Sequence, residues 1–572
     1  EHSAEDIDRL RQRLCEIYGP DGEAWTPRFA ELARPASPPA GRAAARWDER
    51  DVVLIAYADH VRADGESPLH TLREFLVRHH FEQIFKIVHL LPFFPHSSDD
   101  GFSVIDYRSV DPALGQWSDV GDLGRDYDLM FDLVLNHVSA QSRWFQEYLR
   151  GSEPYTRYFH EVDPAADLSA VTRPRSLPLL TEFDTARGPR HLWTTFSADQ
   201  VDLNYAEPRV LLEISEVLLD YARRGARIIR LDAIAYLWKQ IGTSCIHLPR
   251  THAVVRFLRE LLALAAPAAL LLTETNVPHE ENISYFGRGD EAHMVYQFSL
   301  PPLVLDAFLN EDSQPLVGWL HRLAPAPPGA AFLNFTASHD GIGVRPLEGL
   351  VPEERLLRLA EAVRGRGGLV STRHGPGGSQ LPYELNATYF DAITEPGSRE
   401  ADLQVRRFLS SQALMLALRG IPGVYFSSLF GAGNDAAGAA ESGQARRINR
   451  RKFPRDELNR ALVRPESREA QVLAGYRRLL AVRRNQPAFH PDAEQQAWPD
   501  VPPWLIAVLR TSRDERQRIL ALVNVSGQSR RWELPAGAGF RPARELTSGR
   551  AWPQAAGVEL GPYETLWLEL AN

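Results

Sequence analysis

Residues 132–137, Asp132-Leu-Val-Leu-Asn-His137, show the pattern from which the architecture of this chain can be predicted. An apolar, strand-like run ends there on polar and ionisable side chains. Three later stretches repeat the pattern, namely Arg230-Leu-Asp232, Thr273-Glu-Thr275 and Ser338-His-Asp340. Ionisable groups are costly beside buried strands unless they are paired or hydrogen-bonded. Such groups gathered at four strand ends therefore indicate a functional site and not a core.

Apolar strands alternate with amphipathic helical segments on both sides of these stretches. Segments such as 208–224 and 251–266 have helical spacing and separate the strands. Repeated β-α units of this length favour a parallel sheet, and eight of them would close a barrel. The predicted fold class is therefore α/β, a (β/α)8 TIM barrel whose catalytic groups lie at the carboxyl ends of the strands. The expected strands are 52–57, 84–91, 129–135, 227–231, 270–273, 331–335 and 424–426.

Other segments interrupt this alternation and predict additional domains. Two of them are too long for ordinary βα loops, so we expect two inserted loop domains that shape substrate access. The last part of the chain has strands separated by turns, which is typical of a small antiparallel domain. The predicted domains are an N-terminal helical extension at 1–50, the barrel at 51–140, 206–340 and 401–485, an inserted domain B at 141–205, an inserted domain B′ at 341–400 and a C-terminal antiparallel β domain at 486–572.

Composition excludes several function classes. The 572-residue chain has a formal net charge of -10, which argues against a nucleic-acid backbone as its partner. Its apolar stretch at 261–272 is too short for a membrane span. Cys15 and Cys245 alone offer neither a disulfide framework nor a cysteine-rich zinc site. The chain opens without a leader-like pattern, so we expect a cytoplasmic protein that acts on small molecules.

The carboxylates of the quoted stretches suit the cleavage of a glycoside acetal with retention. One carboxylate then attacks the anomeric carbon, and another protonates the leaving oxygen. Arg230 and Asp232 are two residues apart on a strand and face the same side, so the guanidinium would keep this carboxylate ionised. Glu274 follows the apolar run 270–273, a setting that favours a neutral acid. Asp340 is suited to hold sugar hydroxyls and favour a distorted ring.

In this order, the four stretches resemble the four signature regions of the α-amylase superfamily, glycoside hydrolase family 13. The resemblance implies that Asp232 is the nucleophile, Glu274 the acid/base and Asp340 the transition-state stabiliser. Asn136 is a calcium ligand in some amylases, but no carboxylate cluster accompanies it in the sequence, so we expect no metal. The implied supporting ligands are His137, Arg230 and His339.

Further motifs between about residues 50 and 490 are similar to those of sucrose phosphorylase and its relatives. This resemblance implies that Asp99 and Arg446 clamp the far hydroxyls of the glucose ring and that Tyr236 lines the glucose site. The motifs are Leu90-Leu-Pro-Phe-Phe-Pro-His-Ser-Ser-Asp-Asp-Gly-Phe-Ser-Val-Ile-Asp-Tyr107, Gly242-Thr-Ser-Cys245, Phe298-Ser-Leu-Pro-Pro302, His339-Asp-Gly-Ile-Gly343, Gly433-Asn-Asp435 and Arg446-Arg-Ile-Asn-Arg450.

The chain departs from the sucrose-specific pattern in the loops that form the acceptor subsite of these relatives. Glu384 stands where sucrose phosphorylase has a glutamine, and 371–374 is basic. These loops and the long N-terminus resemble those of glucosylglycerate phosphorylases, in which an acceptor with a carboxylate replaces fructose. Four basic side chains are available to bind a carboxylate or phosphate: Arg173, Arg175, Arg373 and His374.

The resemblance implies a glycosyltransferase of the hexosyltransferase kind. Its expected reaction is reversible phosphorolysis of 2-O-α-D-glucosyl-D-glycerate to α-D-glucose 1-phosphate and D-glycerate by double displacement. Inorganic phosphate would be the co-substrate, and no cofactor is expected. The family includes monomers and dimers, so the resemblance implies a monomer or homodimer. Phosphorolysis of sucrose, sucrose 6′-phosphate or glucosylglycerol is the first alternative. An α-glucoside hydrolase or transglucosidase of the same fold is the second, because no short motif distinguishes a water pocket from a phosphate pocket. A non-catalytic relative is disfavoured, because the chain keeps the carboxylates.

Overall fold

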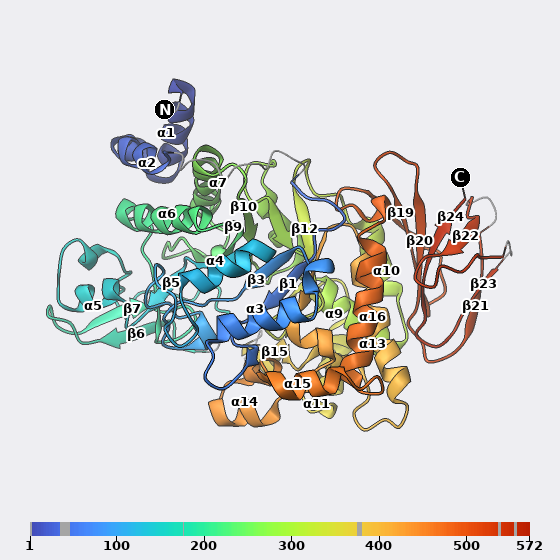
Figure 1. Ribbon diagram of the computed structural model, residues 1–572. Helices are drawn as coiled ribbons and strands as arrows, with labels where there is room; N and C mark the ends of the chain where they lie inside the picture. Colours follow the sequence, from blue (N-terminus) through green and yellow to red (C-terminus); the bar gives the residue numbers. More distant parts are fainter. Residues whose placement is uncertain are drawn as a thin grey trace.

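The computed structural model describes residues 3–34, 46–174, 177–374, 380–535, 539–553 and 557–571, and its centre is a closed barrel of eight parallel strands (Figure 1). This confirms the predicted (β/α)8 fold class. Each expected strand overlaps a barrel strand, although the one at 84–91 begins three residues too early and the one at 424–426 three residues too late. The three-residue strand β11 was not anticipated. In their order around the barrel, the strands are β1 (Val53–Ala56), β16 (Ile421–Tyr425), β12 (Ala331–Asn334), β11 (Met294–Tyr296), β10 (Leu270–Thr273), β9 (Ala226–Asp232), β4 (Asp128–Val134) and β3 (Ile87–Leu90).

Amphipathic helices cover the outside of the barrel (Figure 1). Helix α6 (Pro208–Arg223) shows why: Pro208 is favourable in its first turn, the Glu207 side chain caps Arg209 N, and one apolar face is buried. The other helices that belong to the barrel segments are α3 (Pro68–Arg78), α4 (Trp117–Asp126), α7 (Pro249–Ala265), α8 (His279–Ile283), α9 (Leu300–Asn310), α10 (Gln314–Arg322), α13 (Ala401–Ala417), α14 (Ala436–Ser442), α15 (Arg455–Leu462) and α16 (Arg468–Arg483).

Two excursions from the barrel form small substructures of their own. The first contains α5 (Arg143–Leu149), the hairpin of β6 (Leu180–Phe183) and β7 (Arg190–Trp193), and the antiparallel pair of β5 (His137–Ser139) and β8 (Gln200–Asp202). The second is a three-stranded sheet of β13 (Ile342–Gly343), β15 (Gln380–Asn386) and β14 (Leu369–His374), with α11 (Glu353–Gly365) packed against it. Helix α12 (Tyr389–Ile393) follows β15 and contacts α9 and α13. A short parallel pair joins β2 (Val61–Arg62) and β17 (Phe453–Pro454).

The two ends of the chain pack at different places on the barrel (Figure 1). Helices α1 (Ala4–Tyr18) and α2 (Thr26–Leu32) lie against α7, where the rings of Phe29 and Phe257 are 4.9 Å apart between centroids. The C-terminal sheet is antiparallel in the order β18 (Glu494–Ala497), β19 (Leu505–Thr511), β20 (Arg518–Asn524), β24 (Thr565–Leu570) and β22 (Pro542–Glu545), with β21 (Arg530–Glu533) paired to β23 (Gly557–Leu560).

The domain limits given by sequence reasoning remain predictions, although the helices and strands change character close to them. Among the residues that the structure describes, no helix has the length and apolar character that crossing a membrane requires.

Candidate active site

A pocket of about 710 Å³, open to solvent, lies at the carboxyl ends of the barrel strands. It brings together eight of the residues that sequence reasoning selected: Asp99, His137, Asp232, Tyr236, Glu274, His339, Asp340 and Arg446. Its other lining residues are Phe102, Pro174, Phe196, Gln200, Ala233, Ala235, Thr275, Asn276, Val277 and Tyr383.

Arg230 connects Asp232, which lines the pocket, to a second carboxylate, Asp132, which does not. Its Nη1 donates to Asp132 Oδ1 at 2.5 Å and to Asp232 Oδ1 at 2.7 Å. The parallel register of β4 and β9 places Asp132 opposite Arg230, so the strand pairing itself creates this contact. Burial opposes ionisation of Asp132, but Arg230 and His89 outweigh it and lower the pKa of the carboxyl. Asp132 is therefore a permanent counter-ion for Arg230.

His89 supports Asp132 from the neighbouring strand β3, with its Nε2 2.7 Å from Asp132 Oδ2. A carboxylate only accepts, so this nitrogen must carry the proton. Sequence reasoning did not select His89. The signal was available, because a histidine inside the otherwise apolar run 87–91 is unusual for a barrel interior.

Glu274 is set up as the protonated carboxyl of the site. Burial raises its pKa to about 7; Arg230 opposes this, while Asp232 and Asp340 add to it. The backbone N–H of Ala233 donates to Glu274 Oε2 at 3.0 Å, and Ala233 adopts the left-handed conformation with φ 54°. Such backbone strain is commonly kept at functional sites.

Burial also raises the pKa of Asp232, and this outweighs the opposing effect of Arg230. The guanidinium thus acts in the predicted direction without being the dominant influence. Asp232 is ion-paired to Arg230 at 2.7 Å, whereas Glu274 accepts only a backbone hydrogen bond from Ala233. An ion pair stabilises the charged form of a carboxyl more strongly, so of these two carboxyls Glu274 is the one that carries the proton.

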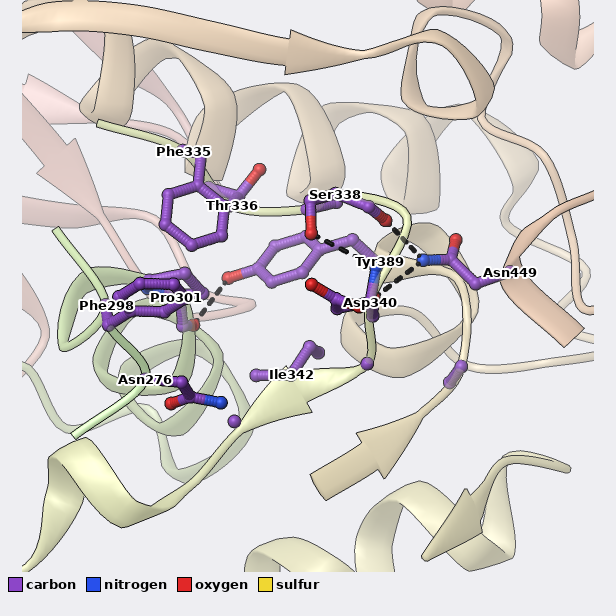
Figure 2. Close-up of a pocket in the computed structure, with 14 residues that line it drawn as sticks. Asn276, Phe298, Pro301, Phe335, Thr336, Ser338, Asp340, Ile342, Tyr389 and Asn449 are labelled. Carbon is purple, nitrogen blue, oxygen red and sulfur yellow. Dashed lines mark hydrogen bonds between the residues drawn. The ribbon is translucent and has the colours of Figure 1, made fainter. Parts of the chain in front are cut away.

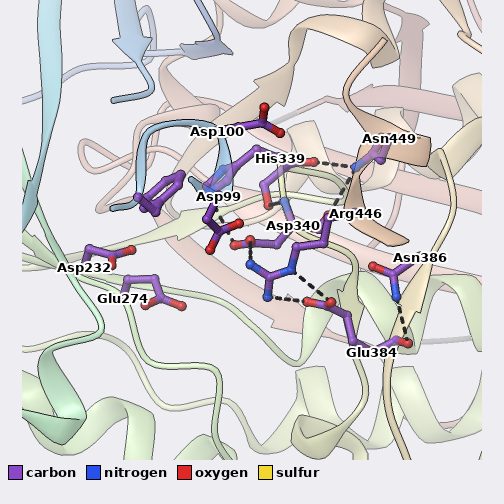
Figure 3. A network of polar contacts seen from close by, with 12 residues as sticks. Asp99, Asp100, Asp232, Glu274, His339, Asp340, Glu384, Asn386, Arg446 and Asn449 are labelled. Atoms are coloured by element: carbon purple, nitrogen blue, oxygen red, sulfur yellow. Dashed lines mark hydrogen bonds and ion pairs between the residues drawn. The ribbon is translucent and has the colours of Figure 1, made fainter. Parts of the chain in front are cut away.

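Asp340 lies across the pocket from Asp232 and Glu274 and is held by Arg446 (Figure 3). Arg446 Nη1 is 2.6 Å from Asp340 Oδ1, and although burial opposes this, Arg446 and His339 hold the carboxyl pKa well below its usual range. The turn that carries Asp340 is fixed by Asn449, whose Nδ2 donates to Ser338 O at 2.6 Å and to Asp340 O at 3.1 Å (Figure 2). Arg450 Nε donates to His339 O at 2.8 Å. Neither Asn449 nor Arg450 had been selected individually.

A second cavity of about 400 Å³ borders the segment that follows Asp340 (Figure 2). Aromatic side chains, including Phe298, Phe335 and Tyr389, line much of it. Asn276 lines both this cavity and the catalytic pocket. Gly343 is needed beside it, because a Cβ at that position would come within 2.3 Å of Asn276 Nδ2.

The two excursions from the barrel contribute part of the pocket lining, including Pro174 and Tyr383. The β14–β15 ladder shifts by one residue between Ser371 and Thr372, which makes Tyr383 the extra residue of a β-bulge that lines the pocket. Sequence reasoning quoted this segment but did not select Tyr383. Arg373 Nη2 is 2.7 Å from Glu348 Oε1. Arg173 donates to Leu177 O and is next to the pocket residue Pro174.

Three of the predicted acceptor residues therefore stand differently in the structure. Neither Arg173 nor Arg373 lines the pocket: Arg173 precedes the lining residue Pro174, and Arg373 pairs with Leu381 of β15. Glu384 also lies outside the lining and instead binds Arg446. Arg175 and the side chain of His374 lie outside the described part of the chain.

Asn136 accepts a hydrogen bond at 2.8 Å from the ammonium of Lys239, a residue that sequence reasoning did not select. The same Nζ is 2.6 Å from Asp202 Oδ2 and donates to Tyr236 O at 2.6 Å. The side chains of Lys239 and Asp202 are almost fully buried. A lysine charge thus sits at the oxygen atoms around Asn136, next to the turn that carries Tyr236. No group of three or more histidine, cysteine or acidic side chains in the described ranges is arranged to hold a metal ion.

The fold and this site define a barrel enzyme with three carboxylates at the strand ends, and comparison with known proteins agrees. Residues 84–316 match the family described as "Alpha amylase, catalytic domain". The chain is 47% identical to a glucosylglycerate phosphorylase of Spirochaeta thermophila over 99% of both chains, and 48% identical to one of Escherichia coli over 78% of this chain and 80% of the other. The crystal structure of a sucrose 6F-phosphate phosphorylase from Thermoanaerobacter thermosaccharolyticum matches with a TM-score of 0.73 and 25% identity, over 85% of this chain and 96% of that one.

The chain therefore belongs to the α-amylase superfamily, in the branch that contains the glucosylglycerate and sucrose phosphorylases.

Proposed function

We propose that the chain is a retaining glucoside phosphorylase that reversibly converts 2-O-α-D-glucosyl-D-glycerate and phosphate into α-D-glucose 1-phosphate and D-glycerate. The observation that carries this proposal is the 47% identity, over almost the entire length of both chains, to a protein named glucosylglycerate phosphorylase. The inserted loops are included in that match, and loops are where acceptor specificity resides in barrel enzymes.

In the first step Asp232 attacks the anomeric carbon while Glu274 gives its proton to the leaving oxygen of glycerate. Glu274 is suited to this role because its pKa of about 7 keeps much of it protonated near neutral pH. Arg230 stabilises the charge on Asp232 before attack. When the ester forms, Arg230 keeps Asp132 as its partner, so no buried charge is left unpaired.

In the second step phosphate attacks the β-glucosyl ester of Asp232, which restores the carboxylate and gives α-glucose 1-phosphate with net retention. Phosphate brings its own acidity: its proton passes to the Glu274 carboxylate and restores the acid, so Glu274 is needed less here than in the first step. Asp340, held by Arg446, supports the glucosyl unit as positive charge develops at its anomeric carbon.

On the acceptor side, we assign Arg173 and Arg373 to bind the anionic acceptor or phosphate, with Tyr383 as the wall beside them. Arg373 is 26% exposed at its side chain and is held by Glu348, so an entering anion can compete for it. The expectations of a cytoplasmic location, of no cofactor besides the co-substrate phosphate, and of a monomer or homodimer remain predictions.

The test is phosphate release from α-D-glucose 1-phosphate with a panel of D-glycerate, glycerol, fructose and fructose 6-phosphate. We expect D-glycerate to give the highest kcat/KM. Preference for another acceptor would reassign the substrate. Release of free glucose with no acceptor preference would indicate a hydrolase.

A further inference from the structure

Glu384 is buried against an arginine of the catalytic pocket and does not itself line that pocket. Its side chain is 4% exposed and meets Arg446 through both oxygens: Arg446 Nη2 is 2.8 Å from Oε1 and Nε is 3.1 Å from Oε2. The remaining terminal nitrogen, Nη1, is 2.6 Å from Asp340 Oδ1. Figure 3 shows Arg446 between the two carboxylates, facing Asp232 and Glu274 across the site.

The surrounding backbone is adapted to this contact. Glu384 is on β15, and Gly343 of β13 pairs opposite it. Gly341 leaves room for the carboxylate, because a Cβ there would come within 2.5 Å of Glu384 Cγ and 2.8 Å of Asn386 Oδ1. Asn386 Nδ2 donates to Ser371 Oγ at 2.9 Å, which anchors the hairpin that carries Glu384. The carboxylate is thus packed in place and not free to sweep across the acceptor side.

A two-point contact fixes more than the charge of a guanidinium. A guanidinium has five N–H donors in one plane, and a carboxylate that takes Nε and Nη2 together sets the orientation of that plane. The outer N–H groups of Nη1 and Nη2 then point in defined directions, one of them toward Asp340. A glutamine at this position would offer one acceptor and would turn its NH₂ group against another donor.

We infer that Glu384 is a positioning residue that acts through Arg446 on the glucosyl side of the site and is not a contact of the acceptor. This rests on the proposed phosphorylase function for its kinetic test. It differs from the expectation that the departure at Glu384 changes acceptor recognition directly.

The distinction is measurable because both donors, glucosylglycerate and glucose 1-phosphate, place the same glucosyl unit beside Arg446. For Glu384→Gln we expect kcat/KM to fall by the same factor for both donors, about tenfold to a hundredfold. The KM values of D-glycerate and phosphate should stay unchanged. Adding Arg446→Lys to Glu384→Gln should cost far less than Arg446→Lys does alone, since the two residues act as one unit.

The experiment compares the full-length wild type with Glu384→Gln, Glu384→Ala and the matched control Glu361→Gln, which removes an exposed carboxylate of α11. Thermal melting shows whether each variant is folded. A rise in the KM of D-glycerate with both donors unaffected would overturn the inference, and so would unchanged kinetics in both Glu384 variants.

A second measurement separates this inference from the proposed function. Calorimetric titration with D-glucose needs no turnover, and we expect glucose to bind more weakly to Glu384→Gln than to wild type and Glu361→Gln. If wild type turned over neither donor, the proposed function would be wrong. The glucose titration would then decide the role of Glu384: weaker binding would support it, and equal binding would overturn it.

Discussion

The two halves of the catalytic pocket are built in different ways. In the glucosyl half, Arg230 and Asp232 are both on β9, their side chains are 2% and 11% exposed, and Arg230 bridges two acids. The half that we propose binds the acceptor includes residues of the excursions from the barrel, and there the side chains of Arg373 and Glu348 are 26% and 40% exposed. The difference indicates that the chemistry depends on rigid, paired charges, whereas acceptor choice depends on exposed groups that a ligand can recruit.

The largest effect should come from Asp232→Asn, which removes the proposed nucleophile from the glucosyl half. We expect kcat for phosphorolysis to fall by at least about 10⁴-fold, as for other covalent nucleophiles. Initial-rate assays with both donors check this, with thermal melting as the control for folding. Retention of near wild-type activity would contradict the assignment of the glucosyl half.

Glu274→Gln should have the next largest effect, and it should depend on the leaving group. With glucosylglycerate as donor we expect a loss of about 10²–10⁴-fold, because glycerate leaves poorly without a proton. With glucose 1-phosphate as donor, the rate of glucosyl-enzyme formation should fall by a smaller factor, since phosphate leaves more readily. Equal losses for both donors in single-turnover measurements would show that Glu274 does not act as the acid.

Lys239→Met tests whether the stability of the fold depends on the buried ammonium beside Asn136. It strands Asp202 without its ion-pair partner at a position that is fully buried. We expect the free energy of unfolding to fall by about 3 kcal/mol, measured by denaturant unfolding. The exposed Arg364→Met on α11 is the matched control and should cost little. Adding Asp202→Asn should recover part of the loss if stranded charge is the cause.

The pH dependence follows from the pKa of Glu274. Because this pKa is raised to about 7, the protonated acid is present below pH 7 and is lost above it. The kcat/KM for glucosylglycerate should therefore decline above pH 7, approaching about tenfold per pH unit. The same limb should be absent in Glu274→Gln. A wild-type profile that is flat from pH 6 to 9 would count against the proton donor.

The smallest effect should come from a substitution in the acceptor half. Arg373→Met should raise the KM of D-glycerate by about tenfold, the scale of one charged hydrogen bond. The KM of glucose 1-phosphate as donor should hardly change, and the melting temperature should stay close to that of wild type. If only the KM of glucose 1-phosphate changed, Arg373 would belong to the glucosyl half, and the contrast between the two halves would be lost.

The sequence by itself determined the barrel and the three carboxylates at its strand ends. Local patterns suffice for this, because strand periodicity and polar residues at strand ends depend on neighbours in the chain. It did not reveal that His89 contacts Asp132, that Lys239 contacts Asn136 or that Tyr383 occupies a β-bulge, because these placements depend on residues distant in the chain.

Only the tertiary structure decided what these charges meet. Glu384 and Arg446 are 62 residues apart, and their bidentate contact depends on the pairing of β15 with β13, the strand that follows Asp340. Burial likewise decided the protonation of the site, because the pKa of Glu274 reflects desolvation and charges from other strands. Local sequence contains neither the distance between such groups nor the water they lose, and those two quantities set the electrostatics of the site.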